Sequence, residues 1–486
     1  MSDREESLKD KTTRGLFWGG MNNGVQQIIG LVFGIILGRW LSRDDFGMIA
    51  MITIFSLVAN NLQASGFKTG LINLKEPRHE DYNSVFWFNV TVSLLIYAVL
   101  FFCAPFIAAY YHQPALVGLC RYAFLGFIFS ACGLAQSAYL AKNYKFKELA
   151  ICNMAATMSS SLVAVTMALL GCSYWSLATQ SLIYMFVNTL LMWHKSTWRP
   201  TLSFDFGPVK RLFPFSVKIM ITVIFSDINA NIMNILLGRH FSARSTGDYN
   251  QAYQWSFKGY SLIQSMVKQV DQPVLVGLHN ESERQMRVLR KMIRFTAFVS
   301  FPLLFGLGLV SHEFIVLTIG EKWTTSASLL PILCLGGAFM PLSALLTDYI
   351  ISKGRSNIYM WCTIFQGICQ LVLMTTLWPY GIRTMVWALV ALNVGWMFLW
   401  LLFVNRISCS YGLLSYLKDT LPFALAAAAV MAITGWLTLS INMLPVLLLC
   451  RIILAAVLYY AVMRIARVHI LQECQQFVLS KLGKKL

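Results

Sequence analysis

Charged residues are scarce in this chain of 486 residues. Only 12% of the residues are Asp, Glu, Lys or Arg, whereas 57% are hydrophobic and the mean hydropathy is +0.61. A typical soluble domain is about 25% charged and about 45–50% apolar. So little polar surface cannot cover the core of a chain of this length in water, which excludes a soluble enzyme, a secreted disulfide scaffold and a disordered protein. The composition predicts a polytopic membrane protein.

Several motifs that indicate other chemistry are also missing. The eleven cysteines form no CxxC pair and lie mostly in apolar runs, as small packing residues do. The seven histidines are isolated and lack the HxxxH spacing, so no metal or cofactor is expected. No GxxxxGK[ST] sequence occurs, which argues against an ATP-driven pump. These absences leave a protein that works through its membrane helices.

Hydrophobic runs follow one another along most of the chain. A spanning helix needs about 20 mainly apolar residues, and fourteen segments meet this criterion. They lie near 15–38, 46–67, 84–109, 116–140, 149–170, 174–193, 212–238, 247–270, 293–310, 327–352, 357–378, 384–405, 416–440 and 443–463. The eighth is interrupted by Lys258 and Lys268, and we retain it because a helix facing a hydrated cavity can carry such residues. We predict an all-α protein with 14 transmembrane helices.

Lys and Arg are unevenly distributed over the two sides of these helices. With fourteen spans both termini lie on one side, which carries 28 Lys and Arg, counting Arg294 and Lys418 at the ends of their spans, against 6 on the other side, and 5 lie farther inside spans. Because positive charge accumulates in cytoplasmic loops, both termini are predicted to be cytoplasmic. The tail 464–486 is predicted to be an amphipathic helix on the inner leaflet. The net charge of +18 therefore reflects topology and lipid contact, and no nucleic-acid partner is expected.

Two segments separated by 200 positions are similar. Ile35–Gly47 reads IILGRWLSRDDFG and Ile235–Gly247 reads ILLGRHFSARSTG, with six of thirteen positions identical. A duplication at this offset gives two six-helix units of the same orientation, an arrangement that places a substrate site between two lobes in transporters. We predict an N-lobe over 1–210, a C-lobe over 211–408, and an extra helix pair with the amphipathic tail over 409–486. A repeat that serves packing alone is the alternative.

Four short sequences resemble a known family of transporters. They are LGRWLSRDDFGMIAMI at the end of the first helix, GDYNQAY (247–253), GEKW (320–323) and SKGR (352–355). Together they resemble the polysaccharide transporter family, most closely the Wzx-type O-antigen and colanic-acid exporters. That family belongs to the multidrug/oligosaccharidyl-lipid/polysaccharide flippase superfamily. The chain departs from the family after the eighth helix, where members often have Pro-Ala-Phe-Ser and this chain has Asp271–Leu275.

The resemblance implies a flippase and not an enzyme. Its substrate would be an undecaprenyl-diphosphate-linked oligosaccharide, moved across the bacterial inner membrane for assembly of lipopolysaccharide O-antigen, capsule or exopolysaccharide. Two helical bundles would alternate between inward-open and outward-open forms. Without an ATP site, an H⁺ or Na⁺ gradient or consumption of the flipped lipid has to drive transport. Membrane lipids and the polysaccharide polymerase machinery are further expected partners, and no cofactor is implied.

Ionisable and amide side chains inside the spans are the candidate site residues. Burying a charge at bilayer depth costs at least about 2.5–3.5 kcal/mol, so such residues mark transport pathways by default. The predicted substrate-binding residues are Lys258, Lys218, Lys268, Arg121, Asn22, Gln26, Asn60 and Asn61. Asp227 and Asp348 are the clear acidic candidates within spans and are the predicted ion-coupling residues, and Asp227 lies deeper. Two alternatives remain open: a structural Asp227–Lys258 pair, and an Arg121 that reaches for the headgroups.

Aromatic side chains on the eighth helix are expected to present ring faces to a sugar chain. They are Tyr249, Tyr253, Trp255 and Tyr260. Three rival functions remain. A multidrug exporter of the same superfamily usually has twelve helices and an acidic cavity, and a peptidoglycan-precursor flippase shares the fourteen helices and the cationic cavity. A membrane-bound polysaccharide polymerase or transferase needs a catalytic cluster that the isolated histidines do not provide.

Overall fold

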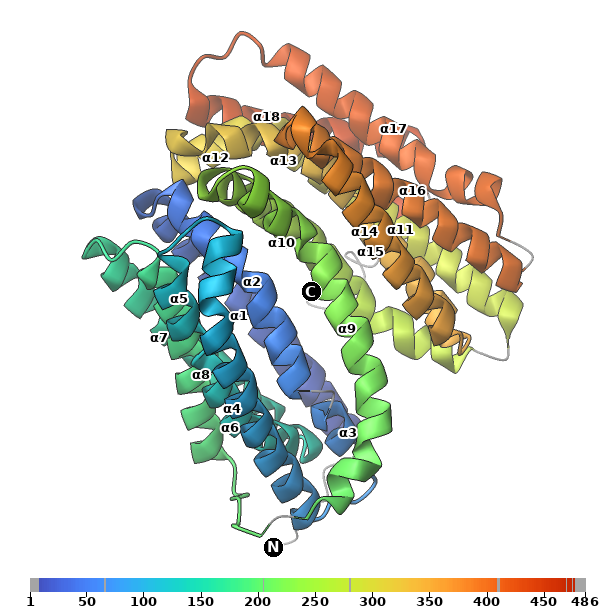
Figure 1. Cartoon of the computed structure of the whole chain (residues 1–486). Coiled ribbons are helices and arrows are strands. Elements are labelled where there is room, and N and C mark those ends of the chain that lie inside the picture. Colours follow the sequence, from blue (N-terminus) through green and yellow to red (C-terminus); the bar gives the residue numbers. More distant parts are fainter. Residues whose placement is uncertain are drawn as a thin grey trace, which may run out of the picture. The chain divides into compact units, whose positions relative to one another are not determined.

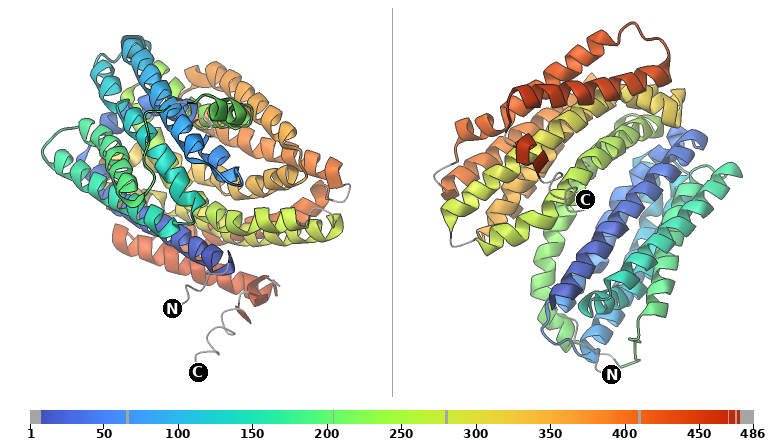
Figure 2. Two further views of the ribbon diagram at one scale, coloured as in Figure 1. Left: turned by 90° about the horizontal axis from the view of Figure 1, so that it is seen from below. Right: turned by 180° about the vertical axis from the view of Figure 1, so that it is seen from behind.

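The computed structural model describes residues 8–64, 67–203, 205–278, 281–408, 411–468, 470–473 and 475–476. All regular secondary structure in these ranges is helical. The helices gather into two compact units, Met1–Gly247 and Asp248–Leu486. Each unit is described by itself, and Figures 1 and 2 show its helices from three directions.

The first unit consists of nine helices and the first turn of a tenth. They are α1 (Leu8–Trp40), α2 (Arg43–Ala64), α3 (Phe67–Asn73), α4 (His79–Tyr110), α5 (Leu116–Ala123), α6 (Gly126–Lys142), α7 (Phe146–Leu169), α8 (Trp175–Lys195), α9 (Gly207–His240) and the start of α10 (Ala243–Gly277). α7 packs against α1 and α8, and α4 packs against α6. α9 packs against α2, α3 and α4 (Figure 1). A core around Met51, Phe124 and Phe127 joins α2, α4, α5 and α6.

The second unit contains the rest of α10 and the helices that follow it. They are α11 (Ser282–Leu309), α12 (Ser311–Ile319), η1 (Glu321–Trp323), α13 (Thr324–Gly337), α14 (Met340–Ser352), α15 (Ser356–Leu377), η2 (Trp378–Tyr380), α16 (Ile382–Ser408), α17 (Leu413–Leu437) and α18 (Leu444–Ile465). α11 lies at the centre, in contact with α13, α14 and α17. The last two helices lie side by side, α17 on α11 and α18 on α12 (Figure 2).

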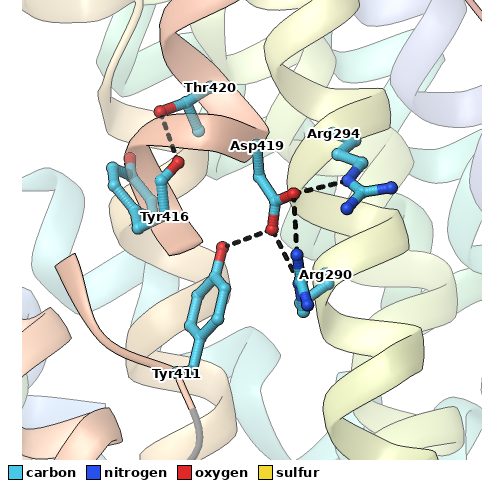
Figure 3. A network of polar contacts seen from close by, with 6 residues as sticks. All are labelled: Arg290, Arg294, Tyr411, Tyr416, Asp419 and Thr420. Atoms are coloured by element: carbon cyan, nitrogen blue, oxygen red, sulfur yellow. Dashed lines mark hydrogen bonds and ion pairs between the residues drawn. The ribbon is translucent and has the colours of Figure 1, made fainter. Parts of the chain in front are cut away.

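Ion pairs attach α17 and α18 to the other helices of this unit, Asp419 in α17 and Arg451 in α18. Asp419 of α17, whose side chain is 1% exposed, accepts hydrogen bonds from Arg290 and Arg294 of α11 (Figure 3). In α18, Arg451 pairs with Glu313 of α12 at 2.8 Å. The extra helix pair of the sequence analysis is thus held by charges as well as by apolar packing.

Helical structure coincides with each of the fourteen predicted segments. Eleven described helical stretches are long and apolar enough to cross a membrane by length and composition. The predicted spans outside this set are α8, α9 and α10, so the count of fourteen stays a prediction. The short helices α3 and α12 were not expected, and the tenth predicted span is divided into α13 and α14. Pro341 in the first turn of α14 explains the division, because proline cannot donate the hydrogen bond that would continue α13.

The predicted duplication is supported by a reciprocal contact. A Cβ atom on Gly47 of α2 would lie 1.7 Å from the carbonyl oxygen of Ala243, and one on Gly247 would lie 2.0 Å from that of Arg43. Adding 200 to positions 43 and 47 gives 243 and 247, so each copy contacts the other through the same pair of positions. Since a Cβ essentially never approaches another atom so closely, only glycine fits at the two positions.

The two helices that meet here also begin alike. The hydroxyl oxygen of Ser42 accepts a hydrogen bond from the Asp45 amide at 3.2 Å, and that of Ser242 accepts one from the Ser245 amide at 3.1 Å. Serine caps of this kind satisfy an amide that has no partner within the helix. The first compact unit ends at Gly247, because α9 packs with the earlier helices of this unit. The predicted lobe boundary at 210/211 follows from the repeat and stays a prediction.

Candidate functional site

An acid–amide pair joins two helices of the first unit. The side-chain amide of Asn61, near the end of α2, donates a hydrogen bond to the carboxylate of Asp227 in α9. Both side chains are half-buried. Asp227 makes no ion pair with a described residue of this unit. A predicted substrate-binding residue, Asn61, is therefore in direct contact with a predicted ion-coupling residue, Asp227.

Further amides continue this polar line along α9. Asn231 donates to the backbone oxygen of Asp227 at 3.0 Å, and Asn234 donates to the side-chain oxygen of Asn231 at 3.3 Å. Positions 227, 231 and 234 lie on one face of a helix. The sequence analysis did not name Asn231 or Asn234, although their i, i+4, i+7 spacing from Asp227 was the signal for them.

An apolar groove borders the Asn61–Asp227 pair. It has a volume of about 730 Å³ and is formed by α2, α4 and α9. Leu62 and Ile228, the residues that follow Asn61 and Asp227, line it together with Phe55, Val99 and other apolar side chains. A hydrogen-bonded carboxylate thus lies beside a surface suited to a hydrocarbon chain.

The other predicted residues of the first unit are distributed differently. Asn22 and Gln26 hydrogen-bond to each other on α1 at 3.1 Å, and Asn60 is half-buried beside Asn61. The Arg121 guanidinium lies 4.1 Å from the centre of the Phe101 ring and contacts the Phe101 carbonyl of α4. Lys218 lies in α9, and the description extends to the helix but not to this side chain.

The predicted residues of α10 lie in the second unit. Lys258 is half-buried, with its ammonium nitrogen 4.6 Å from the centre of the Trp255 ring, a cation–π contact. Tyr249, Trp255 and Tyr260 are buried within the unit, so they do not present their faces to a ligand in this conformation. Tyr253, stacked on Tyr249 at 6.0 Å, is half-buried. The expectation that these rings face a sugar chain stays a prediction, and in this conformation it applies to Tyr253 alone of the four.

Asp348 has a partner that the sequence analysis did not identify. Its carboxyl group adjoins that of Asp271 in α10, and Lys268 lies close to the pair. Asp271 is 1% exposed and Asp348 is 8% exposed. Asp271 was missed because it follows the predicted end of the eighth span. Two adjoining carboxyl groups can share a proton, which makes this pair a second candidate for ion coupling.

Comparison with known proteins places the chain in a family. A model of the polysaccharide biosynthesis protein family matches residues 36–328, more than half of the chain. The chain belongs to this family. It is 24% identical over 366 residues to the lipopolysaccharide biosynthesis protein WzxC of Escherichia coli (strain K12), a match that covers 74% of both chains. It is 25% identical over 436 residues to the teichuronic acid biosynthesis protein TuaB of Bacillus subtilis (strain 168), covering 87% of this chain and 88% of TuaB.

A solved structure shows the same fold. The lipid II flippase MurJ, in an inward closed conformation, matches 92% of this chain and 99% of its own with a TM-score of 0.74 at 14% identity. The resemblance to Wzx-type exporters is thus confirmed, and the family consists of membrane transporters and not of enzymes. The chain is an all-α, multi-pass membrane protein with a fold similar to that of MurJ.

Proposed function

We propose that this transporter flips an undecaprenyl-diphosphate-linked oligosaccharide repeat unit from the inner to the outer leaflet of a bacterial inner membrane. It crosses the membrane fourteen times with both termini in the cytoplasm, and its lobes 1–210 and 211–408 alternate in access. The product feeds the assembly of a surface polysaccharide. Relatives named for lipopolysaccharide and teichuronic acid biosynthesis support this substrate class.

The observation that carries the proposal is the Asn61–Asp227 pair beside the apolar groove. A lipid-linked oligosaccharide has a hydrocarbon chain, an anionic diphosphate and a polar glycan, and the first unit places apolar and polar surfaces next to each other. The groove takes part of the polyprenyl chain. Lys258, with Lys218, Lys268 and Arg121, neutralises the diphosphate, and Asn22, Gln26, Asn60 and Asn61 bind sugar hydroxyls.

Asp227 is the proposed coupling residue. Its carboxylate accepts the Asn61 hydrogen bond between α9 and α2. An H⁺ or Na⁺ ion that binds the carboxylate competes for the same oxygen atoms and weakens the link between the helices. Ion binding would thereby favour the conformational change, with the Asp348–Asp271 pair as a second ion site.

The test is complementation of a knockout in the source organism with wild type, Asp227→Asn or Lys258→Ala. Matched controls are Asp205→Asn and Lys195→Ala, which change an exposed acid and an exposed lysine. The knockout should lose surface polysaccharide and accumulate complete lipid-linked repeats on the inner leaflet. Both site variants should reproduce this defect at normal protein level, and both controls should complement.

Other outcomes would identify a rival function. Normal surface polysaccharide with altered sensitivity to cationic drugs would replace the proposal with a multidrug exporter. Accumulation of a peptidoglycan precursor would indicate a flippase for that lipid. Accumulation of repeats on the outer leaflet would indicate a block after flipping, as expected for a polymerase.

A further inference from the structure

Basic side chains surround the ion pair that attaches α17 to α11. Arg290 binds both carboxylate oxygens of Asp419, at 2.8 and 3.1 Å, and Arg294 binds one of them through Nε at 2.6 Å. Tyr411 donates its hydroxyl to the same carboxylate at 3.2 Å. One buried negative charge thus holds two guanidinium groups that are 35% and 46% exposed. The cluster keeps an excess of positive charge at its surface.

The outer edge of Arg294 remains available for another ligand. Only its Nε atom contacts Asp419, and Figure 3 shows its two terminal nitrogens pointing away from the carboxylate. Arg287 and Lys418 are exposed, and neither forms an ion pair with a described residue. Lys291 pairs with Glu473 at 2.9 Å. The cluster therefore contains two acids, Asp419 and Glu473, and carries a net charge of +3. Its five basic residues are Arg287, Arg290, Lys291, Arg294 and Lys418.

Two hollows meet at Arg294. One, of about 250 Å³, is lined by Arg287, Arg290, Lys291 and Arg294 with Ile470 and Glu473. The other, of about 280 Å³, is lined by Arg294, Lys418 and Asp419 and then by apolar side chains of α17 and α18, among them Phe423, Ala426 and Met463. Arg294 and Ile470 line both. The two hollows form a groove that is cationic at one end and apolar at the other.

We propose that this groove, formed by α11, α17, α18 and the residues Ala466, Val468 and Ile470, binds an anionic phospholipid of the surrounding membrane. Its phosphate lies against Arg287, Arg294 and Lys418, and an acyl chain lies along Phe423, Ala426 and Met463. Basic pockets between membrane helices bind anionic headgroups in this way. The charge of the groove selects an anionic lipid over a zwitterionic one. Because Asp419 of α17 already holds Arg290 and Arg294 of α11, the lipid adds a further connection between these two helices.

The test uses the purified full-length chain in detergent and measures lipid affinity by native mass spectrometry. The probes are phosphatidylglycerol, cardiolipin, phosphatidylcholine and undecaprenyl phosphate. The main variant is Arg287→Ala/Lys418→Ala, which leaves the Asp419 contacts in place. The control, Lys195→Ala/Lys210→Ala, removes two exposed cations of the first unit.

Wild type should prefer phosphatidylglycerol or cardiolipin to phosphatidylcholine by at least about tenfold. Each basic side chain contributes about fivefold in affinity for an anionic lipid, so the main variant should bind about 25-fold more weakly. The control should stay within about twofold of wild type. Equal affinities of wild type and main variant, or equal affinities for anionic and zwitterionic lipid, would overturn the proposal. Tighter binding of undecaprenyl phosphate than of cardiolipin would assign the groove to the substrate instead.

A second variant separates a lipid from a free phosphate. Ala426→Trp fills the apolar hollow without changing the basic residues. It should reduce affinity for long-chain phosphatidylglycerol by about tenfold and leave the weaker binding of the dihexanoyl form unchanged. Equal affinity of wild type for the two chain lengths would show that only the phosphate is bound and would overturn the lipid assignment. An unchanged melting temperature of both variants in lipid-free detergent verifies that they fold.

Discussion

Asp227 and Asp419 are both acids of helices in a membrane protein, yet their surroundings differ. Asp419 is 1% exposed and binds two arginines and a tyrosine, whereas Asp227 is half-buried and binds one asparagine amide. A carboxylate between two guanidinium groups forms charge-assisted hydrogen bonds that link the helices that carry them. One held by an amide can gain a proton or a cation without leaving an unpaired charge behind. The first arrangement suits a fixed attachment, and the second suits an ion-dependent contact.

The largest expected effect is on the attachment at Asp419. Arg290→Met/Arg294→Met leaves a buried carboxylate without a counter-charge, which should lower the free energy of unfolding by about 3–5 kcal/mol. Denaturant unfolding in detergent measures this change. Arg284→Met is the matched control, because Arg284 is 61% exposed in its pair with Glu281 and should lose no more than about 1 kcal/mol. If the two proteins were equally stable, Asp419 would not be a fixed attachment.

Asp227→Asn should change transport strongly and stability little. The Asn61 amide retains an oxygen acceptor, so unfolding should change by less than about 1 kcal/mol. Transport should fall by more than about tenfold, because the amide cannot bind the coupling ion. Flipping of lipid-linked repeats in reconstituted vesicles, with and without an imposed ion gradient, measures the loss. Gradient-dependent transport by the variant would remove Asp227 from the coupling mechanism.

The second ionic attachment should lie between these cases in stability. The Arg451 side chain is 15% exposed, and Glu313→Gln removes the carboxylate that pairs with it. Thr438 and the Leu309 carbonyl still accept hydrogen bonds from Arg451. We expect a loss of about 1–3 kcal/mol. Combining the change with Arg451→Met should restore part of this loss, because the lone charge is then removed. Additive losses in the double variant would show that the two residues stabilise the unit independently.

Tyr411→Phe should have the smallest effect. It removes one hydrogen bond to Asp419 and should cost about 1 kcal/mol of unfolding free energy. Burial and the Asp419 charge raise the pKa of the Tyr411 phenol well above its ordinary value, so the hydroxyl keeps its proton as pH rises. The difference between variant and wild type should therefore be constant between about pH 6 and 9. A difference that disappears toward pH 9 would indicate that Tyr411 ionises there.

Most of the long helices were predictable from the sequence because their hydrophobic length identifies them. The polar partners were less accessible. Asn61 and Asp227 are 166 positions apart, and only the packing of α9 on α2 brings them together. Asp419 and Asp271 were missed for a related reason: one lies near the start of a span and the other just beyond the end of one, where an acid gives no contrast with its surroundings. The repeat was predictable because identical residues at a fixed offset can be recognised without knowledge of the packing.

The close backbone contacts at Gly47 and Gly247 restrict which residues the two repeated segments can carry. Most positions in the repeated segment are free to change in one copy alone, and seven of the thirteen compared here differ. Gly47 and Gly247 are different, because the backbone of each copy fills the space that a side chain in the other would need. A substitution in either half therefore affects both. The two halves therefore share one steric constraint at this point, as the two subunits of a symmetric dimer would.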